Sequence, residues 1–140
     1  MRCYPRLAEP VLDKATEQSR AKTVTRKFPA VLAALGFEKK AGASCIRMVD
    51  GDTWHVWLQK FRHQPALRVA MSFTPAGSEK SSVEFADKWT YRDSPAGRKF
   101  DFSIRWGDDA AERCLQEIHD FVEIVALPWF ADQAAAAKRG

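Results

Sequence analysis

The sequence predicts a two-layer α+β domain, in which helices near both ends of the chain pack on one face of a mainly antiparallel sheet of four or five strands. Two observations lead to this fold class. Apolar residues recur at helical spacing in residues 25–35 and again in residues 109–127. Between these segments, short runs alternate apolar and polar residues and are separated by turn-forming residues, as in strands that bury only one face.

The composition is that of one ordinary globular domain. The chain has 140 residues, of which 46% are hydrophobic and 29% charged, and this length can bury a core without metal or disulfide support. We expect a single domain over residues 25–130. Residues 1–24 are expected to form a loosely ordered or partly helical arm, and residues 131–140 a helical tail that frays.

Both predicted helices contain a proline that leaves a boundary open. The first helix should end at Leu35, with Gly36 as its C-cap. Pro29 either lies in the first turn of a helix that begins near Thr25, or kinks a longer helix. In the last helix, Asp108 is a natural N-cap, and a proline at 128 interrupts the apolar stripe and can restart a terminal helix.

The stretch "SCIRMVDGDTWHVWLQKF" predicts a hairpin of two strands with an open register. A two-residue turn at Asp50 and Gly51 would place Ile46 and Met48 on the face opposite Trp54. A three-residue loop would move both side chains beside that tryptophan. We favour the second register because it gathers the aliphatic residues on one face.

Two further segments alternate clearly. Residues 67–74 and 99–106 each predict a strand with one apolar face. Residues 83–91 fit either a broken strand or a packed loop. The apolar faces of the two clear strands consist of Leu67, Val69, Met71 and Phe73, and of Phe100, Phe102, Ile104 and Trp106.

Charge and cysteine usage favour a cytoplasmic protein. Three cysteines lie far apart with no zinc or redox spacing, and no signal peptide or membrane-spanning run stands in the sequence. The net charge of +4 is mildly basic, below the clustered excess of a dedicated nucleic-acid binder. The Lys and Arg residues between positions 20 and 40 are therefore interpreted first as a solvated helix face and loop.

Signals for catalysis, cofactors and metals are missing from the sequence. It contains no metalloprotease, nucleophile-elbow, phosphate-loop or dinucleotide-binding motif. Cys114 and His119 are five positions apart on a predicted helix, so their side chains project about 140° from each other and cannot share one ion. We therefore expect a protein without enzymatic activity, cofactor or metal site.

The segment "GDTWHVWLQKFRH", residues 51–63, carries aromatic residues on both faces of its predicted strand. If Trp54 faces the core, Trp57 faces the other side, together with residues whose aromatic and hydrogen-bonding groups are typical of interface hot spots. Alternatively, residues 76–99 fold back and bury Trp57. The candidate binding residues are Trp57, Gln59, Lys60, Phe61 and Arg68.

Three motifs resemble an uncharacterised bacterial family of small domains of unknown function: "LAALGFEKKAGASCIR", "HVWLQKF" and "EIHDFVEIVALPWF". The resemblance spans about Thr25 to Phe130 and implies a compact α+β domain with no established activity. The positions that match the family's recurring pattern are Gly36, Phe37, Lys39, Leu58, Gln59 and Lys60.

These observations lead to one functional expectation, one alternative and a third, less favoured interpretation, which is an enzyme of unknown class. We expect a non-catalytic, cytoplasmic module that binds another protein, in an immunity-like or regulatory role. The alternative is a nucleic-acid-binding domain that uses the basic 20–40 stretch and exposed aromatic residues. The sequence leaves the identity of the partner and the oligomeric state open.

Overall fold

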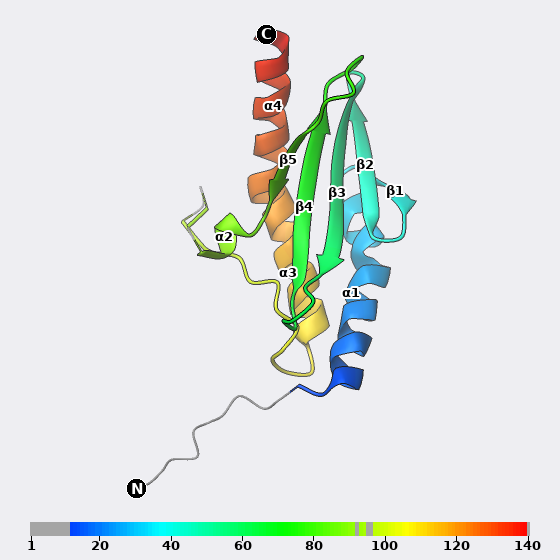
Figure 1. The fold of residues 1–140 in the computed structure, drawn as a ribbon, viewed down its shortest axis with the longest axis vertical. Helices are drawn as coiled ribbons and strands as arrows, with labels where there is room; N and C mark the ends of the chain where they lie inside the picture. The colour runs from blue at the N-terminus through cyan, green and yellow to red at the C-terminus, as the bar shows by residue number, and fades with distance from the viewer. Residues whose placement is uncertain (1–11, 92, 95–96, 140) are drawn as a thin grey trace, which may run out of the picture.

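The computed structural model describes residues 12–91, 93–94 and 97–139, and it confirms the α+β fold. One antiparallel sheet of five strands runs in the order β1-β2-β3-β4-β5 (Figure 1). The strands are β1 (Glu38–Ala41), β2 (Ser44–Val49), β3 (Asp52–Lys60), β4 (Leu67–Thr74) and β5 (Ser82–Phe85). The helices are α1 (Lys14–Ala33), α2 (Lys88–Tyr91), α3 (Ala110–Phe121), the π-helix η1 (Val122–Ala126) and α4 (Leu127–Arg139).

The N-terminal and C-terminal helices cover the same face of the sheet, as predicted. Helix α1 packs on β1, β2 and α3, while α4 packs on β4, and in Figure 1 the sheet stands in front of α3 and α4. We call the covered side the inner face and the other side the outer face. Within the described ranges, no helix has both the length and the apolar character needed to span a bilayer.

Aromatic rings join the inner face to the helices. The ring of Trp54 on β3 stacks on Phe130 of α4 at 4.9 Å, with 5° between the planes. Phe121 of α3 meets the rings of Phe100 and Phe102 edge-on, at 5.4 and 5.7 Å. The buried inner-face residues of the three central strands are Cys45, Trp54, Val56, Leu67, Val69, Met71 and Phe73.

Of the two predicted alternatives for helix α1, the structure has the longer helix and not the one that begins near Thr25. Asp13 caps the helix by accepting a hydrogen bond from the Thr16 amide at 2.8 Å, so Pro29 lies inside a longer helix. Residues 14–24 of the predicted arm are therefore helical, and residues 1–11 lie outside the described residues. The helix ends at Ala33, followed by a turn in which Gly36 has a φ of 89°.

The C-terminal helical segments continue through Pro128, where the sequence indicated an interruption. The π-helix η1 lies just before it, and the Leu127 amide donates to the carbonyl of Val122. This wider turn accommodates a residue that has no N–H to donate. Helix α4 includes the alanine run up to Arg139, and its fraying stays a prediction.

The favoured register of the β2–β3 hairpin is wrong. Val49 pairs with Asp52 across a two-residue turn, in which Asp50 and Gly51 have φ values of 53° and 87°. Positive φ at both positions matches a type I′ turn, whose twist fits the flanking strands better than a longer loop. The carboxylate of Asp52 also accepts a hydrogen bond from the Ala76 amide at 2.8 Å, which joins this turn to the next one.

The strand predicted at 99–106 does not form either. Its only pairing among the described residues is an isolated bridge between Ala66 and Ser103. Its amides alternate between two kinds of partner. The Asp101 and Ser103 amides donate to the side chains of Glu117 and Asp101. The Phe100 and Ile104 amides donate to the backbone carbonyls of Trp89 and Pro65. The alternation still describes burial up to Ile104, but Trp106 is 42% exposed. The sheet edges are β1, which was not predicted, and β5, which covers the start of the segment that fitted either a broken strand or a packed loop.

The turn at Asp50 and Gly51 generates a stability prediction. A Cβ atom on Gly51 would lie 3.1 Å from the Cβ of Ala76, whereas a Cβ on Gly77, at a similar φ of 76°, would meet no atom within 4 Å. Each Gly→Ala change should cost about 1–2 kcal/mol through the left-handed backbone. Gly51→Ala should cost more than Gly77→Ala because of the added contact. Urea unfolding followed by tryptophan fluorescence measures both changes, and equal losses would contradict the crowded turn.

Candidate functional site

The outer face of the sheet gathers the candidate residues. Because paired residues of an antiparallel sheet share a face, its composition follows from the register. One row of neighbours across the strands is Ser44, Trp57, Ala70 and Phe85, and the next is Ile46, His55, Ser72 and Val83. The rows toward the two ends are Met48, Thr53 and Thr74, and Gln59 with Arg68.

No described element covers this face. Strand β5 continues the sheet beside β4 (Figure 1), so the described part of residues 76–99 extends the sheet and does not fold back over it. Trp57 is consequently half-buried, with its ring beside the ring of His55 at 4.6 Å. The structure thus places the second aromatic face of β3 at the surface.

The middle of the outer face is apolar and close-packed. Ala70 is fully buried and Ser72 is only 8% exposed, since each small side chain of β4 lies between larger neighbours on β3 and β5. Toward the margins, Met48 and Val83 are 58% and 52% exposed. These two side chains lie on β2 and β5, on either side of the half-buried rings of His55 and Trp57.

His55 lies in a dry part of this face. Its Nε2 contacts the Ser44 hydroxyl, and burial, with a smaller contribution from the positive charge of Lys40, lowers the pKa of His55. Within the described chain no carboxylate bonds to the ring, so the pair of Ser44 and His55 lacks the orienting acid of a nucleophilic triad. The imidazole is therefore a neutral, partly apolar contact surface at neutral pH.

Arg68 is held in place by its neighbours. Its guanidinium donates to both carboxylate oxygens of Asp87 at 2.8–3.1 Å, and these hydrogen bonds raise the pKa of Arg68. The same group lies 4.1 Å from the ring centre of Phe85 and 5.7 Å from that of Phe61. Arg68 is therefore held in a fixed position, and a contact made by a fixed side chain costs less entropy than one made by a mobile side chain.

The remaining candidate residues separate. Gln59 is exposed and pairs with Arg68, on the outer face. Lys60 pairs with buried Leu67 on the inner side, where its ammonium donates to the carbonyl of Gln64 and forms an ion pair with Glu17, both at 2.7 Å. The structure does not bring Lys60 to the outer face, and its contacts hold the β3–β4 loop against α1.

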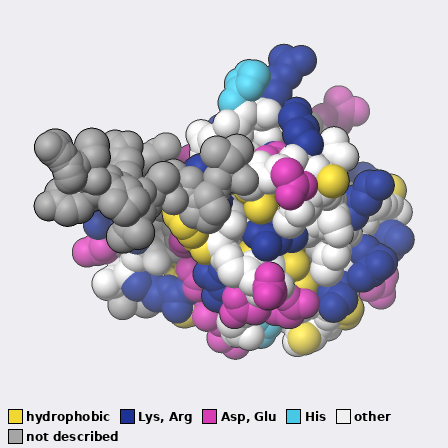
Figure 2. Space-filling view, turned by 90° about the horizontal axis from the view of Figure 1, so that it is seen from below, with side chains coloured by type: hydrophobic (Ala, Val, Ile, Leu, Met, Phe, Trp, Pro, Cys, Tyr) yellow, Lys and Arg dark blue, Asp and Glu magenta, His cyan; other side chains and the backbone are white. Residues whose placement is uncertain are grey.

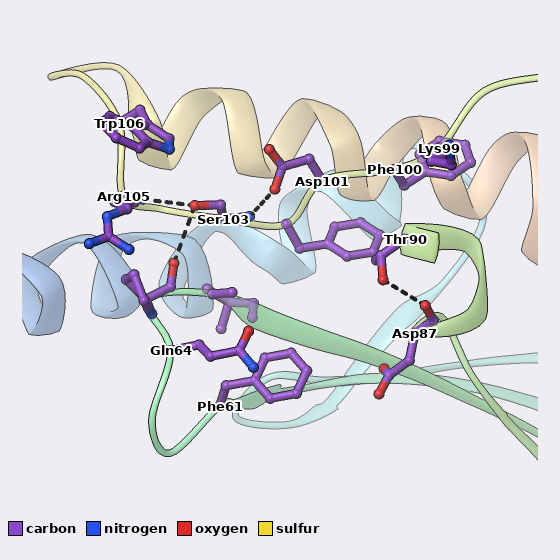
Figure 3. A pocket seen from close by; sticks show the side chains of 14 residues that line it. Phe61, Gln64, Asp87, Thr90, Lys99, Phe100, Asp101, Ser103, Arg105 and Trp106 are labelled. Atoms are coloured by element: carbon purple, nitrogen blue, oxygen red, sulfur yellow. Dashed lines mark hydrogen bonds between the residues drawn. The ribbon is translucent and has the colours of Figure 1, made fainter. Parts of the chain in front are cut away.

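A cleft that the sequence did not indicate adjoins the outer face at Phe61 and Asp87 (Figure 3). Its volume is about 620 Å³. Its two hydroxyls bond to nearby backbone: Thr90 donates to the carbonyl of Asp87 at 2.6 Å, and Ser103 accepts from the Arg105 amide at 3.1 Å. Among the described residues that line it, none is a histidine or a cysteine. The cleft forms between the 61–67 and 87–106 segments, which only tertiary folding brings together.

The described residues also contain cysteine thiols and one group of potential metal ligands. Cys45 and Cys114 are buried free thiols, and burial raises the pKa of Cys114 to about 12, which suppresses the nucleophilic thiolate. His119, Asp120 and Glu123 are the one group of potential metal ligands found among the described residues, within 4.8 Å of one another. Arg98 and Gln116 already bond to Asp120, so the central carboxylate of this group is engaged by protein groups.

Comparisons with models of protein families, with curated proteins and with solved structures find no match to this chain. The resemblance to an uncharacterised bacterial family stays a prediction.

The two tryptophans of β3 provide a matched test of the faces. Trp54→Ala should cost about 3–5 kcal/mol of folding free energy, as truncation of a buried aromatic residue does. Trp57→Ala should cost clearly less, because its ring is half-buried on the uncovered side. Chemical denaturation of both variants measures the difference. Equal, large losses would show that the outer face is covered.

His55 should make stability depend on pH. Because its pKa is lowered on folding, the unfolded chain binds the proton more readily, and the stabilisation is complete above the unfolded value of about 6.5. It should be lost as the pH falls through the lower folded value. Unfolding free energies at pH 7 and pH 5 should thus differ more for wild type than for His55→Gln. The control is His63→Gln, at an exposed loop residue, which should keep the wild-type pH dependence. If His55→Gln also kept it, His55 would not be a source of the pH-dependent stability.

Proposed function

We propose that this chain is a non-catalytic, cytoplasmic module that binds a protein partner through the outer face of its sheet, in an immunity-like or regulatory role. The observation that carries the proposal is the uncovered aromatic and apolar surface of three adjacent strands, β3 to β5, across which Trp57, Ala70 and Phe85 form one row. Aromatic residues and arginine in a rigid setting contribute most of the binding energy in protein interfaces. The partner contacts assigned to this face are Trp57, Gln59, Phe61 and Arg68.

The chemistry of the described residues supports a binding role over an enzymatic one. A catalytic site needs convergent groups such as a nucleophile, its base and an orienting residue. The pair of Ser44 and His55 lacks the third group, and the hydroxyls in the cleft are engaged by backbone atoms. The two described cysteines are buried and unpaired, which fits a reducing compartment.

The charge distribution gives less support to nucleic-acid binding. The guanidinium of Arg20 donates to the carbonyls of Ile104 and Arg105 at 2.8 and 3.0 Å, so this residue of the basic stretch holds the fold together. The exposed cations of α1 lie in the helical layer, across the sheet from the outer-face aromatics. At the end seen in Figure 2, Lys and Arg side chains are interspersed with Asp and Glu. A nucleic-acid site would combine basic and aromatic groups in one groove.

The proposal predicts that a partner depends on Trp57. Pull-downs from the native host should use three folded baits: wild type, Trp57→Ala and Trp106→Ala. Trp106, also partly exposed at 42%, lies in the adjoining cleft and supplies a matched loss of a surface indole. Wild type and Trp106→Ala should capture a common protein, and Trp57→Ala should bind it at least about 30-fold more weakly, as expected for loss of a hot spot of ~2 kcal/mol.

The captured protein is then purified, and its dissociation constants for the three baits are measured by calorimetry. Equal affinity for all three folded baits would contradict a binding role for the outer face. Retention on heparin that falls steeply with salt, in wild type and Trp57→Ala alike, would favour the nucleic-acid alternative.

A further inference from the structure

The two edges of the sheet differ in how they are protected. Strand β1 carries Lys39 and Lys40, has a register irregularity between Lys39 and Ala41, and packs on α1. Lysines and bulges are the usual devices that prevent an edge from pairing with another chain. Strand β5 has the sequence Ser-Val-Glu-Phe and pairs with β4 in an unbroken register. It contains no lysine, proline or bulge, and among the described residues no strand pairs with its other side.

The free hydrogen-bonding groups of β5 belong to Val83 and Phe85. The Ala86 amide donates to the carbonyl of Val69 at 2.9 Å, so at this position the backbone of the edge segment points to β4. Since hydrogen-bonded pairs alternate with non-hydrogen-bonded ones in an antiparallel sheet, Glu84 also bonds to β4. Val83 and Phe85 then point their amides and carbonyls away from the sheet.

We infer that β5 is a docking edge for an extended peptide segment of a partner, which adds to the sheet as a further antiparallel strand. This inference rests on the proposed protein-binding function and names the form of the partner. Residues of the added strand opposite Val83 and Phe85 would lie on the outer face, where they extend the two rows that contain His55 and Trp57. Apolar side chains fit both positions.

The charge of Glu84 selects the residue between these two apolar positions. Glu84 lies at the middle of the edge, on the same side as Met71, and its Oε1 accepts from Lys88 at 2.6 Å. The other carboxylate oxygen remains for a cation of the added strand, so the segment has the pattern apolar, Lys or Arg, apolar. A second copy of this chain fits less well, because antiparallel pairing that sets Val83 of each copy opposite Phe85 of the other would place Glu84 opposite Glu84.

The test uses two synthetic peptides that differ in one residue: a strand-forming peptide centred on Val-Lys-Val, and the same peptide with Val-Glu-Val. Titration of the ¹⁵N-labelled full chain should give the Lys peptide an affinity roughly threefold to tenfold above that of the Glu peptide. Binding should slow hydrogen exchange at the Val83 and Phe85 amides. Glu84→Lys should reverse the preference between the peptides.

Val83→Pro provides the matched block, because it removes an outward-pointing amide and leaves the bonds to β4 intact. A folded Val83→Pro variant should lose peptide binding. It should still capture the Trp57-dependent partner through the outer face, but more weakly than wild type does. Should that variant misfold, Glu84→Lys still decides the result.

Several outcomes would overturn the inference. Absence of binding by either peptide, with partner capture unaffected by Glu84→Lys, would refute the edge site and leave the outer-face proposal standing. If light scattering shows that the wild-type chain is a dimer and that Glu84→Lys or Val83→Pro is a monomer, the occupant of the β5 edge is a second copy of the chain and not a peptide of another protein. Partner binding by Trp57→Ala tests the proposed function separately from peptide binding at β5 and from self-association.

Discussion

The stack of Trp54 on Phe130 determines which side of the sheet is the core. The two rings are nearly parallel, with their centres 4.9 Å apart, and they join the longest strand, near its start, to the C-terminal helix. Because side chains alternate along a strand, burying Trp54 on the inner face turns Trp57 to the outer face. Moving Trp57 into the core would expose Trp54 and separate it from Phe130. The surface assigned to partner binding is therefore a consequence of how the core is packed.

The parts of the fold that depend on local pattern were predictable from the sequence. Alternation in residues 67–74 and the helical stripes near both ends were sufficient to predict the sheet and its one-sided helical cover. The hairpin register was predicted wrongly, because two signals in the sequence conflict. The aliphatic residues favour a three-residue loop, whereas Asp50-Gly51 is a strong signal for a two-residue type I′ turn. The alternation in 99–106 reflects burial on one side, which a strand-like loop with side-chain partners achieves equally well.

The candidate site could be predicted in part. Alternation alone places Trp57 and Gln59 opposite Trp54, and the structure has them there. The same alternation assigns Lys60 to the inner side, a signal that the charge pattern at the end of the strand obscured. The cleft beside Phe61 and the free edge of β5 were beyond the reach of the sequence, because both arise where segments distant along the chain meet or fail to meet. Local periodicity carries no information on which strands lie at the edges of a sheet.

The account depends most directly on the accessibility of Trp57 in the free protein. ¹⁹F NMR of the chain labelled with 5-fluorotryptophan, with resonances assigned by single Trp→Phe variants, can report the accessibility of each of the five indoles. Titration with a soluble gadolinium chelate should broaden Trp106 most, Trp57 next and Trp54 least, since Trp106 is 42% exposed, Trp57 half-buried and Trp54 8% exposed. Protection of Trp57 equal to that of Trp54 would show that the outer face is covered and would contradict its role as a binding surface.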